Sequence, residues 1–194
     1  MSDADYELRF IRAGIDELES YLTTKEIYRL IDVQSKPGAP PYPQFTLGWL
    51  LLFMLKAQAA AESAAQKAEL QKLEARIDAI HSQWRTAWSN KAALELRARL
   101  NLWSAFLEEY RVKPQNNIDR YPYEVTRRVL IQLLAAEVSE LPETEQNALG
   151  GMDVFLTAVF TPGDFVWDPV YKASFPKSSY WYLYGTLRDD LRAG

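Results

Sequence analysis

Residues 49–113 read WLLLFMLKAQAAAESAAQKAELQKLEARIDAIHSQWRTAWSNKAALELRARLNLWSAFLEEYRVK and contain neither glycine nor proline. Fourteen of these residues are alanine and very few are β-branched, so almost every position favours a helix. With Thr46 as a plausible N-cap, the sequence predicts a very long helical stretch over 47–112. One straight helix of that length would measure on the order of 98 Å. A compact chain of this size is only about 42 Å across, so the helix must either break or project.

The apolar positions of this stretch change direction along its length. Between Leu70 and Trp84 they recur at steps of three and four residues, whereas between Trp84 and Leu100 every step is four. Four such steps rotate the apolar face by about 160°, so the two halves are expected to face different partners. Ser89 and Asn90 lie within this drift and disfavour helix interiors, which predicts a possible break at 89–90. The alternative is a continuous helix with a rotating apolar face.

The flanking sequence predicts shorter helices and one irregular segment. Apolar residues share a helical face over residues 8–22, and further helices are expected over 123–141 and 142–160. Four prolines make residues 36–45 an extended connector. Nine of the residues from 160 to 184 are aromatic, which is typical of a segment that closes the open end of a bundle.

Together these patterns predict an all-α fold for the whole chain. We expect a single helical domain over 1–194. It would be a helical bundle with one very long helix, either continuous or else broken or hairpin-forming, and an irregular aromatic-rich C-terminal cap over 161–194.

Composition removes several classes of chemistry. The chain has no cysteine and a single histidine, so thiol nucleophiles, Cys-based zinc sites and two-histidine metal sites are absent from the sequence. No phosphate-binding glycine loop is present. Glu137 and Glu140 share a helical face, but a companion acidic helix for a Mg²⁺ site is not evident. We therefore expect no catalytic residue, no metal and no cofactor, and favour a protein that is not an enzyme.

The charge and the apolar runs bear on partners and location. The net charge is −4 with a pI near 5.2, which argues against a general affinity for nucleic acid or anionic membranes. The most apolar run, 45–55, ends at Lys56 and is too short to span a bilayer. The N-terminus has neither a basic region nor an apolar core typical of an export signal. These features favour a soluble, cytoplasmic protein without membrane contact.

A basic region over 85–128 offers a candidate anion site. It holds nine Lys or Arg against five Asp or Glu, a net +4. Steps of four residues place three charged side chains on one helical face, and a second group of charges and phenols follows the helix. The candidate anion- or ligand-binding residues are Lys91, Glu95, Arg99, Arg120, Tyr123, Arg127 and Arg128. The alternative is a solvated helix face with a salt-bridge network.

A candidate interaction surface combines an apolar face of the long helix with two tryptophans of the C-terminal segment. The helix face consists of Leu70, Leu73, Ile77, Ile80 and Trp84, and the two tryptophans are Trp167 and Trp181. Trp167, flanked by Asp164 and Asp168, could also hold a cation against its ring.

Our leading hypothesis is a protein–protein interaction or scaffold subunit, homo-oligomeric through the long helix. The alternative is a small anionic-ligand-binding protein or enzyme, with a site where the basic cluster at 91–128 meets the aromatic C-terminal segment.

Overall fold

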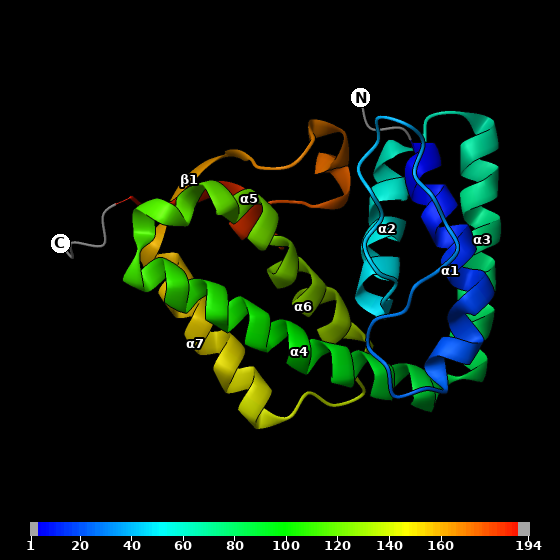
Figure 1. The fold of residues 1–194 in the computed structure, drawn as a ribbon, viewed down its shortest axis with the longest axis horizontal. Helices are drawn as coiled ribbons and strands as arrows, with labels where there is room; N and C mark the ends of the chain where they lie inside the picture. The colour runs from blue at the N-terminus through cyan, green and yellow to red at the C-terminus, as the bar shows by residue number, and fades with distance from the viewer. Residues whose placement is uncertain (1–3, 190–194) are drawn as a thin grey trace.

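The computed structural model describes residues 4–189 as a mostly helical chain with one small antiparallel sheet (Figure 1). The last five residues of the predicted C-terminal cap, 190–194, lie outside the described residues. The elements in chain order are α1 (Ala4–Leu22), α2 (Leu47–Ala60), α3 (Ala64–Gln83), α4 (Arg85–Val112), η1 (Pro114–Asn116), η2 (Ile118–Arg120), α5 (Tyr121–Glu124), α6 (Thr126–Glu137), α7 (Glu143–Val159), β1 (Phe160–Phe165), η3 (Pro169–Ser174), η4 (Trp181–Leu183) and β2 (Tyr184–Leu187).

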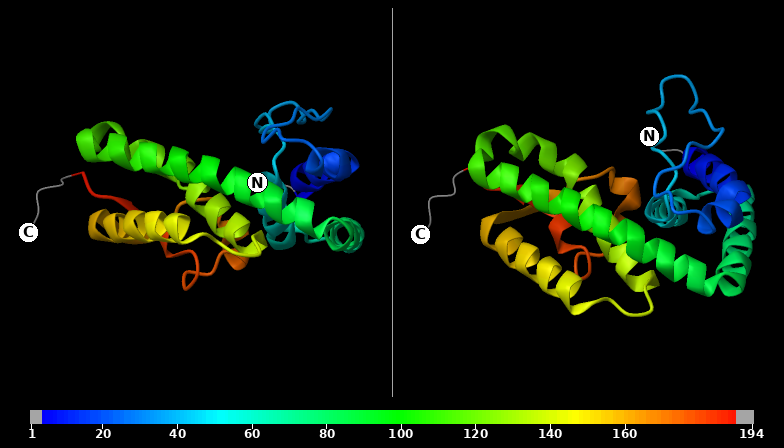
Figure 2. Two further views of the ribbon diagram at one scale, coloured as in Figure 1. Left: turned by 90° about the horizontal axis from the view of Figure 1, so that it is seen from below. Right: turned by 60° about the horizontal axis from the view of Figure 1, so that its bottom comes forward.

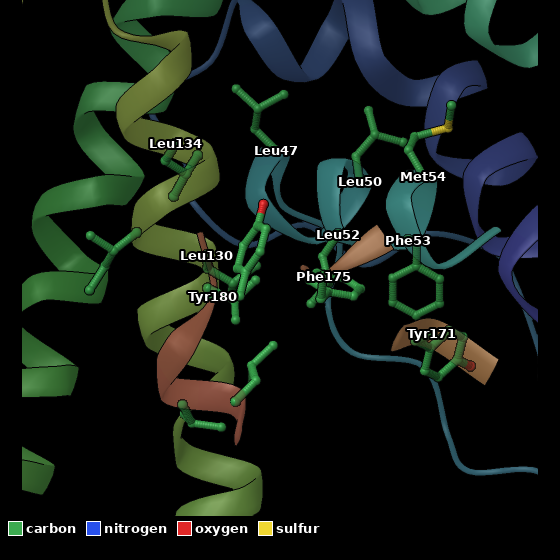
Figure 3. Packing of buried hydrophobic residues seen from close by; sticks show 14 of the residues in the cluster. Leu47, Leu50, Leu52, Phe53, Met54, Leu130, Leu134, Tyr171, Phe175 and Tyr180 are labelled. Atoms are coloured by element: carbon green, nitrogen blue, oxygen red, sulfur yellow. The ribbon is translucent and has the colours of Figure 1, made fainter. Parts of the chain in front are cut away.

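The helices form two groups that share α4 as their common base. In the first group α1 packs against both α2 and α3, and in the second α4 packs against α6 and α7 (Figure 1). Helix α2 also packs against α6 and η3, so the two groups share one core. Figure 3 shows that core, with Leu50 and Leu52 of α2, Leu130 and Leu134 of α6, and Phe175 just after η3.

The very long helix predicted over 47–112 is wrong. The stretch forms three helices, α2, α3 and α4, of which the longest, α4, has 28 residues. Helix α3 runs back along α1, and the chain then turns sharply into α4 (Figure 2). The hairpin-forming alternative therefore fits α2 and α3, which are joined by a short turn at 61–63. The whole stretch packs within a compact chain and forms no projecting arm.

The first break has a local signal in the sequence. Ala61 leaves the helix with an extended backbone, and Ser63 begins α3 with a capping box. The Ser63 hydroxyl accepts a hydrogen bond from the Gln66 N–H, and the Gln66 side chain accepts one from the Ser63 N–H. Because the cap satisfies backbone donors that a continuous helix would satisfy itself, a run of good helix formers can still turn here.

The second break lies at Trp84, and the break predicted at 89–90 is wrong. Ser89 and Asn90 are inside α4, where the Ser89 hydroxyl accepts a hydrogen bond from the Ser139 N–H at 2.9 Å. Ser89 therefore ties α4 to the chain that follows α6. The predicted change of apolar direction is confirmed, since α3 packs on α1 and α4 packs mainly on α6.

The C-terminal segment combines the small sheet with 3-10 turns. Strands β1 and β2 pair antiparallel, with Phe160 opposite Leu187 and Pro162 opposite Gly185. Gly185, within β2, has φ +151°, and a Cβ there would lie 2.1 Å from the Thr161 carbonyl oxygen, so this strand position requires glycine. The segment then packs η3 against α2, at the far side of the core from α7. Within residues 4–189, no helix is long and apolar enough to cross a membrane.

Candidate functional site

The first part of the predicted anion site is buried. Lys91, Glu95 and Arg99 do lie together on α4, but their exposed fractions are only 3%, 0% and 6%. Glu95 accepts hydrogen bonds from the Thr46 hydroxyl at 2.6 Å, the Gly48 N–H at 2.8 Å and Arg99 Nη2 at 2.8 Å. These groups hold the N-terminus of α2 on α4 and leave little surface for a ligand.

Lys91 lies on the same face of α4 and likewise holds another part of the chain against this helix. Its ammonium donates hydrogen bonds to the carbonyl oxygens of Thr24 at 2.7 Å and Glu26 at 2.8 Å, and it lies 4.1 Å from the centre of the Tyr21 ring. Burial lowers the pKa of Lys91 from its ordinary value. Lys91 thereby anchors the chain that follows α1.

The arginines of the second part are each paired with carboxylates. Arg120 bridges Glu109 and Glu124, and Arg127 pairs with Glu124. Their charge is neutralised within the fold, which fits the salt-bridge alternative.

Arg128 brings the basic region to the aromatic C-terminal segment. Its guanidinium makes two bonds of 2.8 Å to Asp153 and lies 4.7 Å from the centre of the Tyr182 ring. Tyr123, in contrast, is 74% exposed and lines a cavity described below.

The predicted interaction surface lies largely inside the single chain. Leu70, Leu73, Ile77 and Ile80 are at most 8% exposed, and α3 packs on α1 along this face. Trp84 is half-buried at the turn between α3 and α4. The structure therefore does not join these residues to the two tryptophans of the C-terminal segment. Trp181 packs edge-on against Phe160, with ring centres 5.2 Å apart.

Trp167 lies against Lys56, which lines an open cavity of about 1020 Å³ that we call the α1–α2 cavity. Its walls come from the start of α1, the proline-rich connector, the middle of α2, and η3, with Tyr123 at one margin. Its aromatic and charged lining includes Tyr6, Glu7, Arg9, Lys36, Tyr42, Trp49, Phe53, Lys56, Asp168 and Tyr171.

The connector forms an aromatic wall of this cavity together with α1 and α2. Tyr42 stacks on Tyr6 with ring centres 4.5 Å apart, and its hydroxyl donates a hydrogen bond to the Tyr6 carbonyl oxygen. Burial raises the pKa of Tyr6 to about 12, so this phenol is uncharged at neutral pH. Phe53 continues the wall, near Tyr171 in Figure 3. Such flat apolar surfaces suit a planar ligand.

Lys56 places a positive charge in this aromatic setting. Its ammonium lies 4.9 Å from the ring centres of both Trp167 and Tyr171. Burial lowers its pKa, an effect that the carboxylates of Glu7 and Asp168 partly oppose. Lys56 makes no hydrogen bond or ion pair within residues 4–189. The cation predicted beside Trp167 is thus a lysine of the same chain.

The two carboxylates of the cavity serve the fold. Glu7 is 1% exposed and accepts a hydrogen bond from the Tyr171 hydroxyl. Asp168 accepts one from the Val170 N–H at 3.0 Å and so caps η3. Arg9, like Lys56, makes no hydrogen bond or ion pair in the described part of the chain. With Lys36, three basic and two acidic side chains line the cavity, and two of the basic ones have no ion-pair partner.

The sequence contained one signal for this site that the prediction did not use. Lys56 is the only charged residue of α2, a helix of otherwise apolar and small residues apart from Gln58. Even a half-buried charge is costly in so apolar a helix unless it has a partner. Arg9, Glu7 and Tyr171 had no comparable signal, because the chain brings them together from α1 and η3.

Comparison with known proteins adds no homologue: no family model, no curated protein and no solved structure matches this chain. Within residues 4–189, no three His, Cys, Asp or Glu side chains come together as a metal site would require.

Proposed function

We propose that the protein binds a small anionic molecule with a flat, apolar body in the α1–α2 cavity. The observation that carries this proposal is the position of Lys56 and Arg9. Both cations line one aromatic cavity, and neither is paired with a carboxylate in the described chain. Lys56 and Arg9 are half-buried, a half-buried cation without an ion-pair partner costs free energy, and an anionic ligand would supply the missing charge.

The sign of the ligand's charge follows from how the acidic residues are used. The carboxylates of Glu7 and Asp168 already accept hydrogen bonds from Tyr171 and from the backbone of Val170. A cationic ligand would compete with these bonds, whereas an anion would use the two unpaired cations. The cavity volume, about 1020 Å³, is ample for a molecule with one or two aromatic rings.

A scaffold role has less support. The apolar residues that would dock a partner through α3 are at most 8% exposed in the single chain. An interaction function would need a different surface or an opening of the α1–α3 contact.

Titration with 1-anilinonaphthalene-8-sulfonate, an aromatic anion that fluoresces in apolar sites, tests the proposal. We expect one saturable site and energy transfer from Trp49 and Trp167. Lys56→Met should weaken binding roughly tenfold, the value of one charge-assisted contact of about 1.4 kcal/mol. Lys172→Met is the matched control, because Lys172 is exposed on η3 and does not line the cavity. Unsaturable binding, or equal affinity in both variants, would contradict the proposal.

A further inference from the structure

The amine of Lys56 has the surroundings of a nucleophile as well as those of a binding group. Its nitrogen lies over two aromatic rings in a cavity open to small molecules, and it makes no hydrogen bond or ion pair in the described chain. Most lysines of a protein lie in water, where the ammonium form dominates at neutral pH. We propose that Lys56 captures the carbonyl group of an anionic ligand as a reversible imine. This inference rests on the proposed ligand site.

Two residues near the Lys56 amine, Tyr171 and Glu7, are suited to the proton transfers that imine formation requires. The Tyr171 hydroxyl donates a hydrogen bond to Glu7, and the Tyr171 ring lies 4.9 Å from Lys56 Nζ. Both residues are at least nine-tenths buried, with exposed fractions of 8% for Tyr171 and 1% for Glu7. A carboxylate and a phenol at this position are chemically able to accept and return protons near the amine.

The reaction balances without an oxidant or a reductant. The ammonium of Lys56 first gives a proton to the carboxylate of Glu7, and the neutral amine then attacks the carbonyl carbon. A new C–N bond forms as the C=O π bond opens, and one proton moves from the nitrogen to the oxygen, giving a neutral carbinolamine. The protonated Glu7 then gives its proton to the hydroxyl, the C–O bond breaks and water leaves, and the nitrogen passes its remaining proton back to the Glu7 carboxylate, so that a neutral C=N bond remains. Hydrolysis reverses each step and releases the ligand.

The two unpaired cations of the cavity have different tasks: Arg9 binds the anionic group of the ligand and Lys56 reacts with its carbonyl group. Arg9 lines the same cavity, and its guanidinium can hold the anionic group of the ligand while Lys56 reacts. Burial lowers the pKa of Lys56, so more of its amine is neutral at a given pH than in an exposed lysine. The favoured ligands are therefore planar aldehydes or ketones that carry a carboxylate or a similar anion.

Reductive trapping on the full chain tests this inference. The probe is 4-formylbenzoate, a planar aldehyde with a carboxylate, in the presence of cyanoborohydride, which converts an imine into a stable secondary amine. Peptide mapping by mass spectrometry then gives the rate of modification at each lysine. We expect Lys56 to react at least tenfold faster than Lys67 and Lys72, which are exposed on α3. As the pH is raised, the labelling rate of Lys56 should begin to increase at a lower pH than the labelling rates of Lys67 and Lys72.

Two controls separate the imine from simple binding. The alcohol 4-(hydroxymethyl)benzoate has the same ring and carboxylate but no carbonyl, so it should slow labelling of Lys56 and leave Lys67 unaffected. Arg9→Met should slow labelling of Lys56 alone. If the dye 1-anilinonaphthalene-8-sulfonate binds as proposed but Lys56 reacts no faster than Lys67, the imine is overturned while the ligand site stands. If the dye finds no saturable site, the ligand site itself fails and the imine falls with it.

Discussion

At the scale of single residues, the molecule contains a buried lysine, Lys91, and a half-buried one, Lys56, with opposite roles. Lys91 donates hydrogen bonds to two backbone carbonyl groups and closes the end of the first helix group. Lys56 makes no such bond within the described chain and faces a cavity. Lys91 therefore ties the chain after α1 to α4, whereas Lys56 makes no such link and is expected to lower the stability of the fold.

Replacing Lys56 by methionine should therefore stabilise the protein. Burial lowers the pKa of Lys56 in the folded chain, so at neutral pH the ammonium costs free energy that it does not cost in the unfolded chain. This cost is fully present below the folded-state pKa and disappears as the pH rises through the ordinary value of 10.5. Lys56→Met should raise the unfolding temperature at pH 7 by about 2–4 °C, for about 1 kcal/mol.

The difference between Lys56→Met and wild type should shrink above pH 10, which thermal unfolding at two pH values can measure. Lys172→Met serves as the control and should leave the unfolding temperature unchanged. A lower unfolding temperature for Lys56→Met would mean that Lys56 supports the fold instead.

Residue-level prediction from the sequence had a clear limit. The spacing of Lys91, Glu95 and Arg99 correctly placed them on one helix face, because helical periodicity is local. Their burial was not predictable, since it depends on Thr46 and Gly48 at the start of α2 docking onto that face. Sequence spacing gives the direction of a side chain along its own helix, and only tertiary packing decides what covers it.

At the scale of secondary-structure elements, helix content was easier to predict than helix ends. Good helix formers fill all three of α2, α3 and α4, and they gave no sign of the turn at Trp84. The turn at 61–63 did have a sign, the Ser63–Gln66 capping box, which was overlooked within an alanine-rich run. The helix over 143–159 was predicted almost to the residue because a proline precedes it and Thr161-Pro162 follows it.

The capping box makes a prediction of its own. Ser63→Ala removes the side-chain acceptor for the Gln66 N–H and should lower the free energy of unfolding by about 1 kcal/mol. Ser82→Ala, at an exposed position within the same helix, should have no destabilising effect. Urea unfolding followed by circular dichroism measures both. Equal stability of the two variants would argue that the turn at 61–63 is set by packing alone.

At the scale of the whole molecule, the cavity exists only because distant parts of the chain meet. Glu7 of α1 and Tyr171 of η3 are 164 residues apart, and their hydrogen bond joins the first helix to the C-terminal segment. The sequence predicted that the basic and aromatic regions would meet, and Arg128 beside Tyr182 is such a contact. The cavity that supports the proposed function lies elsewhere, between α1, the connector and α2, because the C-terminal segment packs back onto α2.

Removing the hydroxyl of Tyr171 should loosen this closure. Tyr171→Phe deletes the hydrogen bond to the buried Glu7 carboxylate, which should lower the free energy of unfolding by about 1.5–3 kcal/mol. Limited proteolysis should then cut more readily between 161 and 189. Tyr123→Phe is the control, since Tyr123 is 74% exposed, and it should behave as the wild type does. Unchanged stability and cleavage in Tyr171→Phe would show that η3 is held without this bond.

The central claim is that unpaired cations make the α1–α2 cavity selective for anions. The most direct test compares two dyes of nearly the same shape, the anion 1-anilinonaphthalene-8-sulfonate and the uncharged N-phenyl-1-naphthylamine, on the wild type and on Lys56→Met. We expect the wild type to prefer the anion by about tenfold or more and Lys56→Met to lose most of this preference. Equal affinity of the wild type for both dyes, or a preference that Lys56→Met leaves intact, would contradict this claim.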